Sequence, residues 1–120
     1  MIPTEPIGSL PRSKTLNGAQ AVKEVIARLE ALGSPVVTDG EQTKSSFVTY
    51  PMAGMALAPE GVTIPFADGH TRRLPVLTKG PFRYGVYADS YLLEAKKHAK
   101  VPVKQAVIAV SAMSLLYPEG

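Results

Sequence analysis

The sequence contains no cysteine, so these 120 residues can form no disulfide and offer no thiolate ligand to a metal ion. Long apolar runs are also lacking, and none approaches the ~18 residues that a membrane-spanning helix needs. The N-terminus does not show the ordered charged, apolar and small-residue segments of a signal peptide. We therefore expect a cytoplasmic protein with no membrane partner.

Several motifs of known chemistry are missing as well. The sequence has no G-x-G-x-x-G, Walker loop or G-x-S-x-G. It has no RNP, zinc-finger or helix-turn-helix pattern, so no nucleic-acid partner is expected. Its two histidines, His70 and His98, have no neighbouring carboxylate at metal-ligand spacing, which favours structural or solvated roles for both.

Proline, glycine and positive charge are plentiful. Eleven prolines and ten glycines predict frequently interrupted elements, in one domain with a modest core. Segment 71–104 holds eight of the thirteen Lys and Arg residues, opposed only by Asp89 and Glu94. A solvated helix face and a polar hairpin are the favoured interpretation of this segment. Attraction of phosphate, a nucleic acid or a polycarboxylate tail is the alternative.

Residues 17–33 give the clearest helical pattern. Asn17 is expected to cap the start, and Gly33 to provide the left-handed end. The short β-branched strand "VVT" follows Pro35, so helix and strand form half of a βαβ unit. The apolar stripe consists of Val22, Val25, Ile26, Leu29 and Leu32, at spacings of three and four.

The rest of the chain alternates between extended and helical patterns. Residues 2–12 predict a short or edge-like strand, because three prolines interrupt them. Residues 103–112 are almost continuously apolar, as in a strand buried on both faces. The segments between are expected to be a long loop with one helical turn (43–60), a β-hairpin turning at Asp68-Gly69 (61–79) and a helix capped by Asp89 or Ser90 (88–100).

This order predicts an α/β fold with a parallel sheet, in which functional groups lie at the C-terminal ends of strands. Ser9, the pair Asp39 and Glu41, and Ser111 all lie at such predicted ends. From the residues alone, Asp39 and Glu41 are either part of an ordinary polar turn or a polar ligand site. No reaction follows from this pattern.

Four blocks of the sequence together resemble the cobalamin-independent methionine synthase family. They are "IPTEPIGSLPR", "LEALGSPVVTDGEQTKSSFVTYP", "IPFADGHTRRLPVLTKGPFRYG" and "AKVPVKQAVIAVSAMSLLYP", and they cover nearly the whole chain. The resemblance implies a TIM (β/α)₈ barrel that transfers a methyl group from 5-methyltetrahydrofolate to homocysteine. It also implies a zinc ion that activates the homocysteine thiol as thiolate.

The resemblance assigns roles to a few positions. Ile7, Gly8 and Ser9 match the family's I-G-S, which contacts the amino-acid part of homocysteine through backbone and hydroxyl. Gly40 and Glu41 match its G-E, whose glutamate binds the homocysteine ammonium. Asp39 would add negative potential beside Glu41.

The chain also departs from the family, whose zinc ligands are His, Cys, Glu and Cys from later barrel strands. With no cysteine here, no metal site is expected. A barrel typically needs ~250 residues, so residues 1–120 are expected to be a single-domain N-terminal fragment of about three βα units. Such a fragment would be inactive alone, with an open edge for oligomerisation or for the rest of the barrel.

Two alternatives remain open at this point. One is a non-catalytic small-molecule-binding or oligomerising remnant of the barrel. The other is a fragment of a related thiol alkyltransferase that uses a different acceptor. The basic segment 71–104 matches a polyglutamylated folate in charge, so Arg72 and Arg73 are candidate folate contacts.

Overall fold

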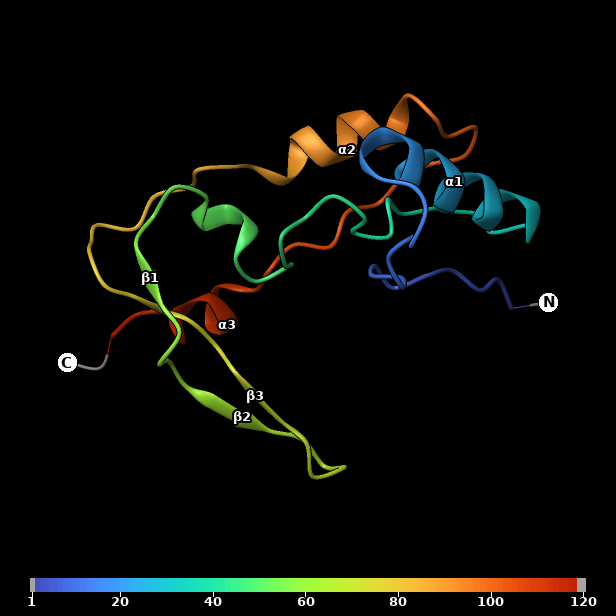
Figure 1. Ribbon diagram of the computed structural model, residues 1–120. Helices are drawn as coiled ribbons and strands as arrows, with labels where there is room; N and C mark the ends of the chain where they lie inside the picture. The colour runs from blue at the N-terminus through green and yellow to red at the C-terminus, as the bar shows by residue number, and fades with distance from the viewer. Residues whose placement is uncertain (1, 119–120) are drawn as a thin grey trace.

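The computed structural model describes residues 2–118, which form short helices and strands joined by long connections (Figure 1). The helices are α1 (Gly18–Ala31), α2 (Ala88–Lys96) and α3 (Val110–Ser114), with a 3₁₀ turn, η1 (Tyr50–Met52). The strands are β1 (Leu57–Ala58), β2 (Thr63–Pro65), β3 (Thr71–Arg73) and β4 (Val76–Leu77). In this part of the chain they form two antiparallel pairs, β1 with β4 and β2 with β3.

The helix α1 follows the apolar periodicity of its sequence. Val22 and Ile26 are buried, whereas Leu32, the last residue of the expected stripe, is exposed because it lies beyond the helix end. Gly33 adopts a φ of +76°, and its N–H bonds to the carbonyl of Glu30 at 2.9 Å. The prediction of a glycine-ended helix is therefore confirmed.

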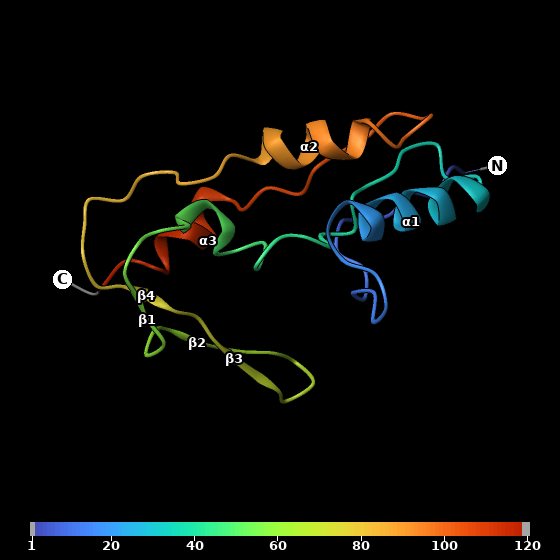
Figure 2. The same ribbon diagram turned by 45° about the horizontal axis from the view of Figure 1, so that its top comes forward.

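The expected parallel sheet is reduced, within residues 2–118, to a single parallel bridge between Val37 and Val103. The N–H of Val37 bonds to Pro102 and its carbonyl accepts from the N–H of Lys104, at 3.0 and 2.9 Å. Val22 and Ile26 of α1 and Ala95 of α2 pack with the two bridge residues, and the two helices lie at the same end of the molecule (Figures 1 and 2). We call this part the helical lobe; its buried apolar side chains are Val22, Ile26, Val37 and Ala95.

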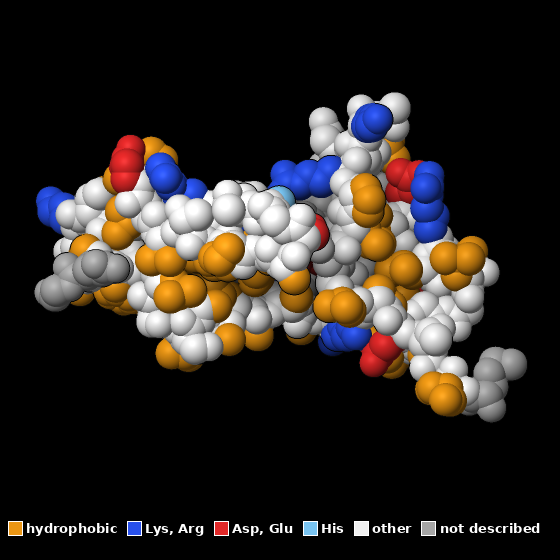
Figure 3. Space-filling model, turned by 90° about the horizontal axis from the view of Figure 1, so that it is seen from below, with side chains coloured by type: hydrophobic (Ala, Val, Ile, Leu, Met, Phe, Trp, Pro, Cys, Tyr) orange, Lys and Arg blue, Asp and Glu red, His pale blue; other side chains and the backbone are white. Residues whose placement is uncertain are grey.

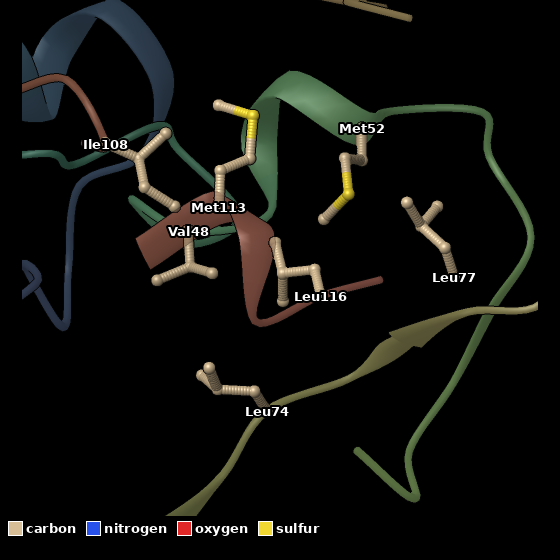
Figure 4. Close-up of a cluster of buried hydrophobic side chains, with 7 residues drawn as sticks. All are labelled: Val48, Met52, Leu74, Leu77, Ile108, Met113 and Leu116. Atoms are coloured by element: carbon tan, nitrogen blue, oxygen red, sulfur yellow. The ribbon is translucent and has the colours of Figure 1, made fainter. Parts of the chain in front are cut away.

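A second apolar cluster, drawn in Figure 4, is built around α3 and the strands at the other end of the molecule from α1 (Figure 1). The hairpin β2–β3 turns at Asp68-Gly69, as predicted, with Gly69 at a φ of +87°. The pairing of β1 with β4 was not expected from the sequence. We call this part, with η1 and α3, the hairpin lobe; its buried side chains are Val48, Met52, Leu74, Leu77, Ile108, Met113 and Leu116.

The predicted strand at 103–112 is wrong from residue 110 onward. Residues 103–109 are extended, but α3 begins at Val110. Helical spacing lets Met113 and Leu116 both enter the hairpin-lobe cluster, which a strand would not allow because alternate residues face opposite sides. Ser111 therefore lies in a helix and not at a strand end.

Other local predictions also fail. Residues 2–12 form no strand; one backbone bond, from the N–H of Leu10 to Gly40, ties them to the chain at 3.1 Å. The helix expected at 88–100 ends at Lys96, and its N-cap is Tyr87 with extended backbone instead of Asp89 or Ser90. Asn17 occupies the N-cap of α1, but its side chain makes no capping hydrogen bond.

The described residues do not form a closed barrel. The radius of gyration is 16.2 Å, compared with about 14 Å for a compact domain of this length. Hydrophobic side chains gather on the face of the molecule that Figure 3 shows. Among the described residues, the most exposed large hydrophobic side chains are those of Ile7, Ile2, Leu32, Val110, Val107 and Tyr87. None of the helices in residues 2–118 is both long and apolar enough to cross a membrane.

Candidate functional site

The structure brings Gly8 and Glu41 together. The hydroxyl of Thr38 donates to the carbonyl of Gly8 at 2.9 Å, which holds the N-terminal segment against the end of the extended segment 36–39. A Cβ on Gly8 would lie 3.3 Å from Oε1 of Glu41 and 3.0 Å from Cβ of Ala106. Three separate segments therefore meet at Gly8, and the glycine makes room for the carboxylate.

Ile7 and Ser9 flank this point on the surface. Ile7 is 93% exposed and Ser9 is also exposed, whereas Gly8 is buried. The hydroxyl of Ser9 and the backbone of Ile7 are therefore open to a ligand, while Gly8 contributes the close packing.

Gly40 and Glu41 form a sharp turn that presents the carboxylate. Gly40 has a φ of +63°, and Glu41, a non-glycine residue, has a φ of +55°. Left-handed backbone is uncommon for such a residue and is concentrated at functional sites. The carboxylate of Asp39 stabilises the turn by accepting the N–H of Glu41 at 3.0 Å.

Asp39 is a buried charge beside this turn. The residue is 2% exposed, and its Oδ2 has no hydrogen-bond partner among residues 2–118. A buried carboxylate without full pairing is destabilising. Burial, followed by the negative charge of Asp39, raises the pKa of Tyr91, which reaches this region from α2.

Gln42 ties the N-terminal segment to the turn. Its amide nitrogen donates to the carbonyls of Leu10, Pro11 and Gly40 at 3.2–3.3 Å. Its oxygen accepts the N–H of Ser13 at 2.9 Å. Sequence reasoning missed Gln42, because nothing in the letters "GEQ" indicates which distant carbonyls the amide will meet.

Lys44 is fully buried, at 0% exposure, which sequence reasoning also missed. Its Nζ donates to the carbonyl of Ala106 at 3.0 Å. It lies 4.8 Å from the ring centre of Tyr50 and 5.4 Å from that of Tyr91. The two rings meet edge to face, so an aromatic pair surrounds the ammonium.

Tyr50 links this buried lysine to the candidate site. Its pKa is raised by burial first, then by Tyr84, Tyr91 and the carboxylate of Glu41. The negative charge of Glu41 therefore contributes to the raised pKa of Tyr50, whose ring also lies beside Lys44. Tyr50 therefore lies between the buried Lys44 and the carboxylate of Glu41.

A cavity of about 300 Å³ lies next to Gln42, on the side of the N-terminal segment. Its charged wall residues are Arg12, Lys14, Arg28 and Glu24, and Arg28 pairs with Glu24, so the excess positive charge comes from Arg12 and Lys14. The basic residues predicted to attract an anion lie elsewhere. Of those in segment 71–104, Arg72 and Arg73 lie on the exposed strand β3 and Lys96 ends α2. The others lie in the connections: Lys79 and Arg83 between β4 and α2, and Lys97, Lys100 and Lys104 after α2.

The residues that the structure describes, 2–118, do not fit a zinc ion. Within residues 2–118 no group of three or more His, Asp or Glu side chains is placed to hold a metal. The prediction that the histidines lack a carboxylate neighbour is wrong, however. His70 lies 2.5 Å from Asp68 at the hairpin tip, and His98 lies 3.3 Å from Glu94 on α2. Each is a pair with one carboxylate, and the two pairs belong to different lobes.

No protein-family profile matches this chain, and no curated protein matches it. Among solved structures, the chain is similar to a B12-independent methionine synthase from Shewanella sp. W3-18-1, in complex with selenomethionine. The TM-score is 0.73 at 20% identity, over 96% of this chain. The chain spans 40% of the length of that protein. At this identity the likeness supports the fold alone.

Proposed function

We propose that this chain carries the amino-acid-binding part of a methionine-synthase-type site and binds homocysteine through Glu41 and the Ile7–Gly8–Ser9 segment. The observation that supports this most is the packing of the Glu41 carboxylate against Gly8. The structure of the similar enzyme is a complex with selenomethionine, an α-amino acid like homocysteine.

The chemistry of the site suits the two charged groups of an amino acid. The carboxylate of Glu41 would accept charge-assisted hydrogen bonds from the ligand ammonium. Asp39, directly behind it, would add negative potential. The exposed Ser9 hydroxyl and the backbone of Ile7 would face the ligand carboxylate.

The proposal assigns only binding to residues 1–120, taken as one domain equivalent to the first part of the barrel. The family activity is methyl transfer from 5-methyltetrahydrofolate to homocysteine, with zinc at the thiol. Because the described residues do not fit zinc, we assign no methyl-transfer step to them. That step would need residues beyond those described.

Calorimetric titration of the chain with L-homocysteine tests this proposal. Glu41→Gln keeps the shape of the side chain but removes its charge. A hydrogen bond to a charged group contributes about 1.5–3 kcal/mol, so we expect affinity to fall roughly 10- to 150-fold. Glu60→Gln, the same change at an exposed position beside the hairpin lobe, should leave affinity unchanged. Equal affinity of wild type and Glu41→Gln, or no binding by wild type, would contradict the proposal.

Two further measurements separate the alternatives. A thiol without amino or carboxylate groups, such as 2-mercaptoethanol, should not compete with homocysteine. If it competes fully, a related thiol alkyltransferase site explains the chain better. Formation of methionine from homocysteine, 5-methyltetrahydrofolate and zinc by this chain alone would show that the division between binding and transfer is wrong.

A further inference from the structure

The buried ammonium of Lys44 is the least expected charge in the helical lobe. A charged group removed from water is strongly destabilising unless it is paired and hydrogen-bonded. Lys44 has one hydrogen bond, to a backbone carbonyl, and two aromatic faces. Within residues 2–118 it forms no ion pair within 4 Å with a carboxylate.

The contacts of Lys44 connect the three segments that meet at Gly8. Its backbone lies three residues after Glu41, and its carbonyl accepts a hydrogen bond from Arg12, which follows the Ile7–Ser9 segment. Its ammonium reaches the carbonyl of Ala106 in the extended segment 103–109. Lys44 therefore contacts all three segments: its backbone carbonyl binds Arg12, its side-chain ammonium binds Ala106, and its own segment carries Glu41.

Ala106 connects the contact of Lys44 to the packing at Gly8. Its Cβ lies 3.0 Å from the position that a Cβ on Gly8 would take, and Oε1 of Glu41 lies at 3.3 Å from the same position. A shift of Ala106 away from the helical lobe would therefore open the space at Gly8 into which the Glu41 carboxylate fits. Binding groups must be held within about 0.5 Å to function.

We infer that Lys44 is a positioning residue for the amino-acid site: by fixing the Ala106 carbonyl it sets the distance between Gly8 and the Glu41 carboxylate. Tyr50 and Tyr91 hold the ammonium in place and supply part of the stabilisation that it loses on leaving water. This inference rests on the proposed function for its ligand. The geometric link between Lys44, Ala106 and Gly8 can be measured without any ligand.

The test compares Lys44→Met, which keeps an unbranched chain but removes the donor, with Lys44→Arg, which keeps the charge and donors. Lys23→Met, on the exposed face of α1, is the matched control. Titration with L-homocysteine should show at least a tenfold loss of affinity for Lys44→Met, partial recovery for Lys44→Arg and no change for Lys23→Met. Amide NMR of the ligand-free proteins should show shifts at Gly8 and Ala106 that are largest for Lys44→Met, smaller for Lys44→Arg and absent for Lys23→Met.

Each outcome decides one of the two proposals. Unchanged Gly8 and Ala106 amides in a folded Lys44→Met protein would overturn the positioning role, whatever the affinity. A loss of affinity that Lys44→Arg repeats in full, without shifts at these amides, would overturn it as well. If wild type binds no homocysteine, the proposed function fails, while the amide shifts still decide the role of Lys44. If Lys44→Met does not fold, Lys44→Arg decides the role. Wild-type values, or affinity and amide shifts that change together, support the role, whereas a loss of affinity without shifts at Gly8 and Ala106 contradicts it.

Discussion

The two lobes are built from different kinds of sequence. In the helical lobe, two helices cover a parallel contact, and polar side chains gather at the end of that contact. In the hairpin lobe, short strands, a 3₁₀ turn and a five-residue helix surround a cluster that includes two methionines. Every predicted homocysteine contact belongs to the helical lobe or to the N-terminal segment tied to it. The helices and the parallel bridge of the helical lobe hold charged side chains at fixed positions, whereas the hairpin lobe mainly buries apolar side chains.

The largest expected effect comes from opening a cavity in either cluster. Ile26→Ala in the helical lobe and Leu116→Ala in the hairpin lobe each remove a fully buried side chain, and each should lower the free energy of unfolding by about 2–5 kcal/mol. Urea unfolding followed by far-ultraviolet circular dichroism measures both. Leu93→Ala, at an exposed position of α2, should change it by less than about 0.5 kcal/mol.

The unfolding curves of these variants also show whether the two lobes unfold as one cooperative unit. Because Val103 packs in one cluster and Ile108 in the other, we expect the two lobes to unfold together. If Leu116→Ala leaves the transition of the helices unchanged, the lobes are independent and this expectation is wrong.

A smaller effect is expected from backbone crowding in the hairpin lobe. The N–H of Gly85 bonds to Pro51 at 2.7 Å, and a Cβ there would lie 2.2 Å from the carbonyl oxygen of Ala53. Gly85→Ala should therefore destabilise the protein by roughly 1–3 kcal/mol, as other overpacked sites do. Thermal unfolding of Gly80→Ala is the control, since a Cβ there has nothing within 4 Å. Equal melting temperatures for the two variants would contradict this account.

The smallest effect concerns alkaline pH. Burial raises the pKa of both Tyr50 and Tyr91 above the ordinary value of 10.0. The folded protein therefore keeps these protons to higher pH than the unfolded chain. The resulting stabilisation is fully present below roughly pH 10 and is lost as pH rises through the folded pKa values.

Tyrosine absorbance at 295 nm and urea midpoints at pH 9 and pH 11 measure this loss, in a chain without tryptophan. Tyr91→Phe should lose less stability between these pH values than wild type. Tyr117→Phe, at an exposed position, should behave like wild type. A Tyr91→Phe protein with the full wild-type loss would show that burial of Tyr91 has no such role.

Sequence reasoning succeeded where a local signal was strong. The period of α1, the left-handed Gly33 and the Asp68-Gly69 turn each depend on a few adjacent residues, and the structure has all three. It failed at residues 110–112, because an apolar run fits a buried helix as well as a buried strand. The two-residue strands β1 and β4 are too short to leave a pattern.

For the site, the structure packs the Glu41 carboxylate against Gly8, and the homocysteine contacts that the family resemblance assigns to these residues stay a prediction. No sequence pattern around Lys44 indicates that this lysine is buried. Its partners, Tyr50, Tyr91 and Ala106, lie 6, 47 and 62 residues away along the chain. Only the folded arrangement shows that a lysine, usually a surface residue, is enclosed here.

Segment 103–109 has a thermodynamic consequence for any ligand at Gly8. It contributes Val103 to one cluster, Ile108 to the other, and Ala106 to the point between them. A ligand that binds better when Ala106 occupies its position in this structure also stabilises the hairpin lobe against opening. By linkage, opening of the hairpin lobe weakens ligand binding by the same free energy. Susceptibility of the β2–β3 turn to a protease should then report, from the far end of the molecule, whether the amino-acid site is filled.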